Sequence, residues 1–557
     1  MEKRVFVAVL LSIAILVGFP AIMSKLFPQY YKKPVPAVTK TTTVTTGSQP
    51  AVAAPATTSA AAPVSPAPAQ AGGLKPAPTV DIAAPSQFFT TIAANDFIAV
   101  FSNRGAELVS FKLKGYKAKD GTLVELVKAR DASRTDFAFA IEAADPNVGR
   151  TLNTGLYVLD DKTVNNERVL TYSFASGGIA ATKTFRLDDE YLFHFNVSVT
   201  PPVKYRVAIG PGIRTLDPDE RDSQFIITGN GVVQIDNSLK LVRREKADPN
   251  NVYENAQYAG IEDNYFLAAL KPEKASTAIL RRIDVPVVSN AQKKDEKRPE
   301  LYAAINADNG VVAGSAFFGP KQTTILDRYG LEKTLQFGMF GVIARFLLLA
   351  LLWVNKFTHN YGWAIIALTV VIKIVLYPLQ HKSIVSMKKM QKVQPKAEAI
   401  KAKYKKAKTD PEQRNKMNME VMKLYQQEGI NPMGGCLPMV LQLPILWGFY
   451  GLLSRAIELR GAPWILWIHD LSAKDPTYIL PILMTATMFV QQFLTPTTVD
   501  PAQRRMFLFM PLIFGWIFKE FPSGLVLYWL VQNILSIVQQ LIMNKYWKDH
   551  PDEIKTA

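Results

Sequence analysis

The chain has 557 residues, of which 48% are hydrophobic, and it carries a formal net charge of +17. This length exceeds a single domain, and the uneven pattern of apolar and polar stretches excludes a simple soluble protein. Much of the positive charge lies beside apolar segments, above all in residues 381–430, which favours membrane topology and anionic partners over nucleic acid. The only cysteine is Cys436, which excludes an intrachain disulfide.

An apolar run at residues 5–23 follows a short charged N-terminus and predicts either a cleaved signal peptide or an uncleaved anchor. We favour a transmembrane anchor over residues 1–25, with its N-terminus in the cytoplasm, because no clear small-x-small cleavage site ends the run. Residues 26–86 are rich in Ala, Pro and Thr and poor in large apolar residues, so they predict a flexible linker.

Residues 87–321 have the pattern of a large all-β domain. Short runs alternate apolar and polar residues, as in FIAVF at 97–101 and YLFHFNVSV at 191–199, which is typical of strands with one buried face. Breaks rich in Gly and Asn, such as GNG at 229–231, separate these runs as hairpin connections do. We therefore predict an antiparallel β-sandwich.

Sidedness decides which apolar stretches after the β domain cross the membrane. With the N-terminus inside, the first span places the β domain outside, and one further crossing brings the Lys-rich residues 381–430 inside, as the positive-inside rule requires. We therefore predict that 337–354 is an interfacial amphipathic helix, within a segment 322–358. The second span is then 362–379, within a segment 359–380.

Residues 432–545 are predicted to contain four further spans with short loops. A span needs about 17–25 apolar residues to cross roughly 30 Å of hydrocarbon, and several stretches barely reach this length. The stretches are 433–457, 478–494, 506–521 and 525–545. Alternation of sides along them predicts six transmembrane helices in all, with the tail at 546–557 in the cytoplasm.

Residues 381–431 predict a basic helical hairpin on the cytoplasmic side. Asp410 and Pro411 provide an N-cap and a first-turn proline for its second arm, and Gly429 marks the far end. The two arms carry lysines that we consider for docking: Lys388, Lys389, Lys392, Lys401, Lys405 and Lys406. Their charge suits either ribosomal RNA and nascent-chain machinery or a solvated face that attracts anionic lipids, and charge alone does not decide between these alternatives.

Lys373 is the most informative residue because it lies inside the second predicted span, in IIALTVVIKIVLYPL. A lysine at the centre of a span costs about 2.5–3.5 kcal/mol, which usually indicates a polar cavity or a paired charge. The alternative is that the side chain extends toward the cytoplasmic end of the span. We favour a polar cavity because other polar residues lie at span depth, namely Thr369, Gln442, Gln532 and Asn533.

The usual catalytic motifs are absent from the sequence. It contains no GxxxxGK[ST] and no HExxH, and its five histidines lack metal-ligand spacing, so we expect neither an enzyme nor a cofactor. A transporter or channel is the main alternative, because an intramembrane lysine with nearby amides also suits an ion site, although no inverted repeat of the spans is visible. A third alternative is a membrane-bound enzyme that acts on envelope sugars through its β domain.

Four segments closely resemble the YidC family of bacterial membrane protein insertases: NYGWAIIALTVVIKIVLYPLQHKSIVSMKKMQKVQPK, INPMGGCLPMVLQLPILWGFY, APWILWIHDLSAKDPTYILPILM and FPSGLVLYWLVQN. The resemblance covers residues 337–545, and the β domain resembles the family more loosely. It implies a conserved core of five transmembrane helices, a periplasmic β-supersandwich as in Gram-negative members, and insertion and folding of newly made inner-membrane proteins.

The resemblance also implies a hydrophilic groove that is open to cytoplasm and lipid and has a positive residue at its centre. That position is Lys373 here, where the family usually has arginine, so the charge is kept but the planar fork is lost. Thr369 and Gln442 match groove-lining positions, Tyr528 matches a groove aromatic, and Trp529 stands where a second tyrosine is common. The implied partners are nascent membrane proteins, the Sec translocon and the ribosome.

Overall fold

The computed structural model describes residues 80–549, except residues 119, 128–136, 166, 188–189, 215–228, 249, 287–296, 405–409, 431–436 and 495–500. The predicted anchor at 1–25 and most of the predicted linker and tail lie outside the described residues. Lys405 and Lys406, two of the lysines considered for docking, also lie outside them.

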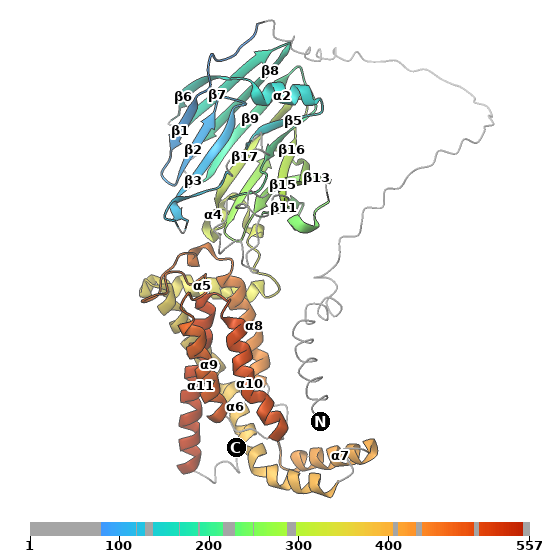
Figure 1. Ribbon diagram of the computed structural model, residues 1–557, viewed down its shortest axis with the longest axis vertical. Coiled ribbons are helices and arrows are strands. Elements are labelled where there is room, and N and C mark those ends of the chain that lie inside the picture. The colour runs from blue at the N-terminus through green and yellow to red at the C-terminus, as the bar shows by residue number, and fades with distance from the viewer. Residues whose placement is uncertain are drawn as a thin grey trace, which may run out of the picture. The chain divides into compact units, whose positions relative to one another are not determined.

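The residues after the linker form two antiparallel sheets (Figure 1). A four-stranded sheet has the order β1 (Phe89–Ala93), β2 (Phe97–Ser102), β3 (Glu107–Lys117), β4 (Leu123–Glu125). A 13-stranded sheet has the order β5 (Ala140–Ala143), β10 (Tyr205–Ile209), β16 (Lys297–Asn306), β15 (Ser276–Pro286), β13 (Asn250–Glu262), β14 (Phe266–Pro272), β17 (Val311–Pro320), β9 (Leu192–Thr200), β8 (Ile179–Leu187), β7 (Glu167–Ser176), β6 (Val158–Val164), with β11 (Asn230–Ile235) paired to β13 and to β12 (Ser238–Val242). Helix α2 (Pro146–Thr154) follows β5. The prediction of a β-rich domain is confirmed.

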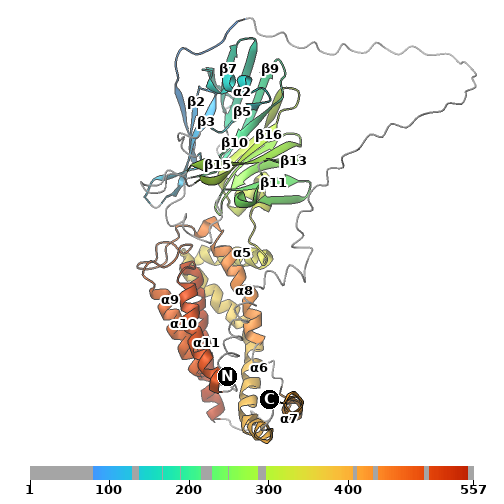
Figure 2. The ribbon, with the colours of Figure 1, turned by 45° about the vertical axis from the view of Figure 1, so that its right-hand side comes forward.

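Alternating burial explains why these residues form strands that share one core. In β9, Phe193, Phe195 and Val197 are buried, while the residues between them are more exposed, which is the two-residue period of a strand with one buried face. Aromatic rings then join the two sheets: Phe101 of β2 lies 4.7 Å from Phe185 of β8, measured between ring centroids. Figure 2 shows β2 and β3 as a layer beside the larger sheet.

An ion pair on β6 and β7 predicts a pH-dependent stability of this domain. Arg168 donates two hydrogen bonds to Asp161, at 3.0 and 2.6 Å, and these hold the pKa of the Asp161 carboxyl below its usual value of 3.8. Since the folded pKa is lowered, the stabilisation is present above pH 3.8 and is lost as the pH falls through the folded pKa. We expect Asp161→Asn to lower the free energy of unfolding by about 0.5 kcal/mol near pH 7, because the pair is partly exposed.

Thermal unfolding of the unchanged protein and of Asp161→Asn at several pH values tests this expectation. The difference in melting temperature should disappear at acidic pH, where the unchanged carboxyl is also neutral. Asp160→Asn is the control, since Asp160 is the neighbouring aspartate on β6. Its own ion pair, with Lys162 at 2.6 Å, joins side chains that are 54% and 68% exposed, so we expect its loss to have a smaller effect. An Asp161→Asn difference that is the same at every pH would contradict the ion-pair explanation.

The C-terminal half is helical and has its own apolar core. Its helices are α4 (Thr323–Tyr329), α5 (Gly341–Thr358), α6 (Tyr361–Lys403), α7 (Pro411–Gln427), α8 (Leu437–Leu453), α9 (Ile479–Leu494), α10 (Pro501–Phe518) and α11 (Ser523–Asp549), with short 3-10 turns at Glu332–Thr334 and Ile457–Leu459. Leu348, Leu351, Phe449 and Leu453 are among the side chains of its core. Among the described residues, α5, α6 and α11 are long and apolar enough to cross a membrane, while α8, α9 and α10 contain shorter apolar helices.

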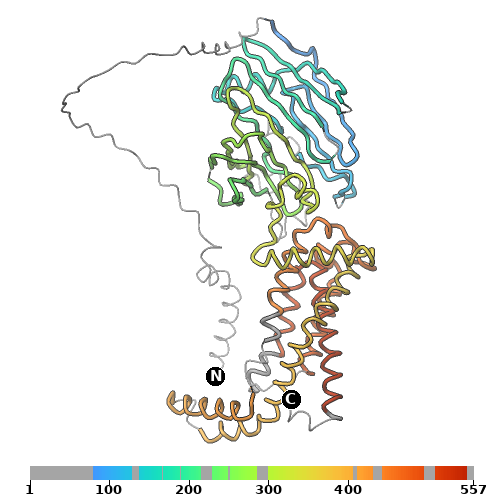
Figure 3. The backbone as a smooth tube through the Cα atoms, turned by 180° about the vertical axis from the view of Figure 1, so that it is seen from behind, coloured from blue at the N-terminus to red at the C-terminus, as the bar shows by residue number. Residues whose placement is uncertain are grey.

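Helix α6 is continuous across the predicted boundary between residues 380 and 381. The predicted second span and the first arm of the basic hairpin form one continuous helix of 43 residues. Helix α7 lies beside the last turns of α6 (Figure 3), and two ion pairs join this region, Lys396 to Glu428 at 2.6 Å and Lys403 to Glu420 at 2.9 Å. The predicted hairpin therefore begins inside a longer helix.

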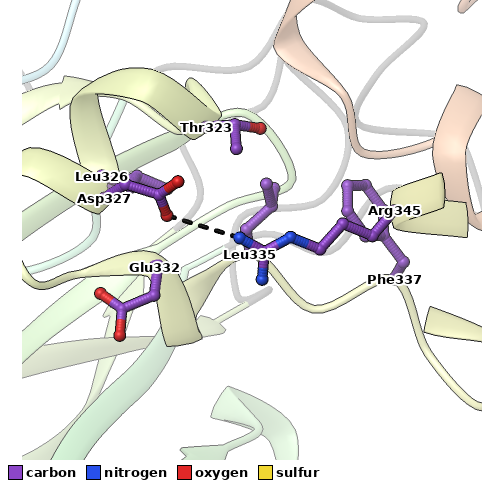
Figure 4. A pocket seen from close by; sticks show the side chains of 7 residues that line it. All are labelled: Thr323, Leu326, Asp327, Glu332, Leu335, Phe337 and Arg345. Carbon is purple, nitrogen blue, oxygen red and sulfur yellow. Dashed lines mark ion pairs between the residues drawn. The ribbon is translucent and has the colours of Figure 1, made fainter. Parts of the chain in front are cut away.

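Helix α5 has two different apolar faces. One face is buried against the helical core through Ala344, Leu347, Leu348 and Leu351. The other exposes large side chains that recur every three or four residues: Val342, Phe346, Leu349, Trp353 and Phe357. Figure 1 shows that α5 lies across α8 rather than along it, and Figure 4 shows the ion pair, 3.6 Å long, between Arg345 of α5 and Asp327 of α4.

Candidate functional site

Lys373 lies on the part of α6 that packs against α11. Its residue is only 9% exposed, and its Nζ donates a hydrogen bond to the Oγ of Ser536 on α11, at 2.8 Å. In the part of the chain that the structure describes, no carboxylate forms an ion pair with Lys373. The ammonium is therefore buried beside a neutral acceptor, with its positive charge unpaired among the described residues.

One face of α11 continues this polar contact toward α8. Tyr528, Gln532 and Ser536 are spaced four residues apart, so they lie above one another on the helix. Gln442 of α8 donates to the hydroxyl of Tyr528, and the Nε2 of Gln532 donates to the Oε1 of Gln442 at 3.4 Å. We call Lys373, Gln442, Tyr528, Gln532 and Ser536 the polar strip, because hydrogen bonds link them within α6, α8 and α11.

Packing as well as hydrogen bonding holds Tyr528 in the polar strip. The Tyr528 side chain is fully buried, and its ring stacks on Phe449 of α8 with the centroids 4.3 Å apart. The hydroxyl of Ser536 donates to the backbone oxygen of Gln532 at 2.8 Å, one turn earlier on the same helix. Thr369 lies one turn before Lys373 on α6 and is fully buried, but its hydroxyl donates to Ile365 of its own helix at 2.6 Å.

Trp529 and Asn533 lie on a neighbouring face of α11 and are not brought to the polar strip. The ring of Trp529 packs on Phe514 and Phe518 of α10, with centroid distances of 6.0 and 5.0 Å. Asn533 donates to the hydroxyl of Thr487 on α9 at 3.2 Å. These two predicted site residues therefore join helices of the bundle, while Lys373, Gln442, Tyr528 and Gln532 form one hydrogen-bonded group.

Hydrogen bonds of Asn360, the N-cap residue, hold the N-terminal end of α6, the helix that carries Lys373. The side-chain oxygen of Asn360 accepts from the backbone nitrogens of Gly362 and Trp363, and its Nδ2 donates to the backbone oxygen of Trp464 at 3.1 Å. A Cβ on Gly362 would lie 2.1 Å from the ring of Trp464, so only glycine permits this close contact.

Two family matches cover most of the chain. Residues 353–550 match the family described as 60Kd inner membrane protein, and residues 90–350 match the YidC periplasmic domain. A membrane protein insertase YidC of Geotalea uraniireducens is 37% identical over 558 residues, which cover 98% of this chain and 99% of the relative. Its counterpart in Geobacter metallireducens is 35% identical over 561 residues and covers 98% of each chain. The chain belongs to the YidC family of membrane protein insertases.

Solved structures of YidC proteins also match, at lower identity. An active YidC insertase with its first transmembrane domain resolved is 20% identical, has a TM-score of 0.36, and covers 83% of this chain and 94% of its own. YidC from Thermotoga maritima is 14% identical, has a TM-score of 0.29, and covers 81% of this chain and 98% of its own. As a YidC protein, this chain is a multi-pass inner-membrane protein with a periplasmic domain.

The lysines that we considered for docking, as far as the structure describes them, differ in their surroundings. The ammonium of Lys388 lies 5.8 Å from the ring centroid of Trp547 on α11. Lys389 is partly buried, whereas Lys392 and Lys401 are exposed. Lys388 therefore helps to join α6 and α11, and Lys392 and Lys401 are the more accessible cations.

Ser536 is the member of the polar strip that sequence reasoning missed. Its position follows Tyr528 and Gln532 by steps of four, and this spacing is the signal that could have found it. Within the described residues, no group of three or more His, Cys, Asp or Glu side chains could hold a metal ion. The polar strip itself offers hydrogen-bond donors and acceptors and one positive charge.

Proposed function

We propose that the protein inserts and folds newly made membrane proteins by receiving a polar or acidic segment of the client at the polar strip. The observation that carries the proposal is the buried ammonium of Lys373, which has a serine hydroxyl as its partner and no paired carboxylate among the described residues. A client carboxylate would supply the missing charge, and the amides of Gln442 and Gln532 would replace water around polar groups. The strip would thereby lower the free energy of bringing such a segment into the membrane.

The proposed groove opens toward the cytoplasm and the lipid, and six helices cross the membrane. The large domain, a β-supersandwich, then lies in the periplasm, and the basic hairpin and the C-terminus lie in the cytoplasm, in agreement with the positive-inside rule. The two apolar faces of α5 support its place as an interfacial helix, since one face meets the core and the other suits acyl chains. Arg345 on this helix also favours an interfacial position over a span.

The proposed partners besides the client are the Sec translocon, the ribosome and anionic lipids. The exposed cations Lys392 and Lys401 on the basic hairpin support contact with RNA phosphates or lipid headgroups. We propose that the hairpin receives the ribosome, since α6 connects it directly to the span that carries Lys373.

Proteoliposomes that contain only this protein test the proposed function. We expect a single-span client with an acidic translocated tail to become protected from external protease in these vesicles. Protein-free vesicles of the same lipid composition are the control, and they should protect far less of the client. Equal protection in both, with the protein shown to be folded, would contradict insertase activity, and vesicles that conduct ions but leave the client outside would favour a transporter.

A further inference from the structure

Ser536 is the hydrogen-bond partner of the Lys373 ammonium. A lysine side chain is long and flexible, and inside a membrane it tends to extend toward the nearest aqueous edge. The bond of 2.8 Å from Nζ to Ser536 opposes this, because it fixes the ammonium against α11 at the level of the polar strip. Ser536 lies on the same face of α11 as Gln532 and Tyr528, so it aligns the charge with the other polar groups.

Toward Lys373, the hydroxyl of Ser536 is an acceptor. Its own proton is committed to the backbone oxygen of Gln532 at 2.8 Å, which leaves its oxygen lone pairs for the ammonium of Lys373. An ammonium has three N–H donors, and this contact uses one of them. A neutral partner also leaves the whole positive charge uncompensated, whereas an aspartate at this position would neutralise it.

We propose that Ser536 is a positioning residue that holds the Lys373 ammonium in the polar strip. There the cation has no counter-charge among the described residues, and two of its donors, unused within that part of the chain, are left for a carboxylate of the client. This inference rests on the proposed function, and it adds that the hydroxyl of Ser536 makes insertion selective for acidic clients. The competing explanation is that Ser536 only joins α6 to α11, as hydroxyl groups often do between membrane helices. The two explanations differ in whether the effect of removing the hydroxyl depends on client charge.

The test compares Ser536→Ala and Ser536→Thr in proteoliposomes, with two clients that differ only in an acidic or a neutral translocated tail. A hydrogen bond to a charged group contributes enough that its loss should reduce insertion of the acidic client about tenfold. Insertion of the neutral client should change much less. Threonine keeps a hydroxyl that can bond to the backbone one turn earlier, so Ser536→Thr should retain most of the activity.

Val538→Ala is the matched control, because Val538 lies two residues further on α11 and is 47% exposed on its outer face. Thermal unfolding of each purified variant shows whether the helical bundle is intact. Equal insertion of the acidic client by Ser536→Ala and the unchanged protein would overturn the inference. So would an equal loss for both clients, since that is the result of a purely structural role.

The same experiment separates this inference from the proposed function. If the unchanged protein inserts neither client while folded, the proposed function itself fails. If the unchanged protein inserts the acidic client and Lys373→Ala does not, the function stands, and the result for Ser536→Ala alone decides the role of Ser536.

Discussion

Replacing Lys373 by alanine should remove most of the insertion of a client with an acidic translocated tail, whereas Lys373→Arg should keep it. The ammonium is buried beside a serine hydroxyl, so a client carboxylate can provide the opposite charge. Two unit charges about 4 Å apart attract by on the order of 4 kcal/mol at an effective dielectric constant of about 20. Even when desolvation offsets most of this attraction, we expect insertion to fall at least about tenfold.

Protease protection of the client in proteoliposomes measures this effect. Lys545→Ala is the matched control, because Lys545 is an exposed lysine near the C-terminal end of α11 and lies outside the polar strip. A neutral-tailed client should depend less on Lys373 than the acidic one does. If Lys373→Ala inserts the acidic client as well as the unchanged protein, the charge is dispensable, and extension of the side chain toward the cytoplasm explains Lys373 better.

The sequence predicts the chemistry of the polar strip better than its geometry. Lys373 stands out because it is a charged residue within an apolar run. Gln442 and Gln532 stand out because they are polar amides within apolar runs. The residue facing Lys373 does not stand out, since serine is common in membrane helices and Ser536 is 163 residues away in the chain. Only the packing of α11 against α6 identifies it.

Depth in the membrane is readable from sequence, but the direction in which a side chain points is not. Trp529 and Asn533 each follow a member of the polar strip by one residue, which turns them by about 100° around the helix axis. Sequence therefore places them at the same depth as Tyr528 and Gln532. Contacts with α9 and α10 show that they serve the packing of the bundle.

A change in composition along the sequence need not coincide with the end of a helix. The composition changes from apolar to basic near residue 380, yet lysine, glutamine and methionine are good helix formers, so α6 continues through this change. In the β domain, alternation predicts the strands but not their order. Neighbours such as β14 and β17, or β13 and β11, depend on long-range pairing that no local pattern records.

The second large effect is expected in the β domain, where Lys183→Met should strongly lower stability. Lys183 on β8 is fully buried, and its Nζ donates to the backbone oxygens of Gly105 at 2.6 Å and Phe139 at 2.7 Å. These two hydrogen bonds connect the β2–β3 turn and the residue before β5 to β8. Methionine fills a similar volume without a donor, and each buried carbonyl left unsatisfied costs about 1–3 kcal/mol, so we expect a loss of roughly 3 kcal/mol.

Thermal unfolding of the full chain in detergent, with proteolysis of the β domain as a second probe, measures this loss. Lys162→Met is the matched control, because the Lys162 side chain is 68% exposed on β6, and we expect it to change stability by no more than about 0.5 kcal/mol. Equal melting temperatures for the two variants would mean that the two carbonyls find other donors. Lys183 is far in sequence from the polar strip, and it bonds to Phe139, which belongs to the core of the β domain. Lys183→Met should therefore leave insertion at low temperature unchanged, whereas Lys373→Ala should reduce it at every temperature.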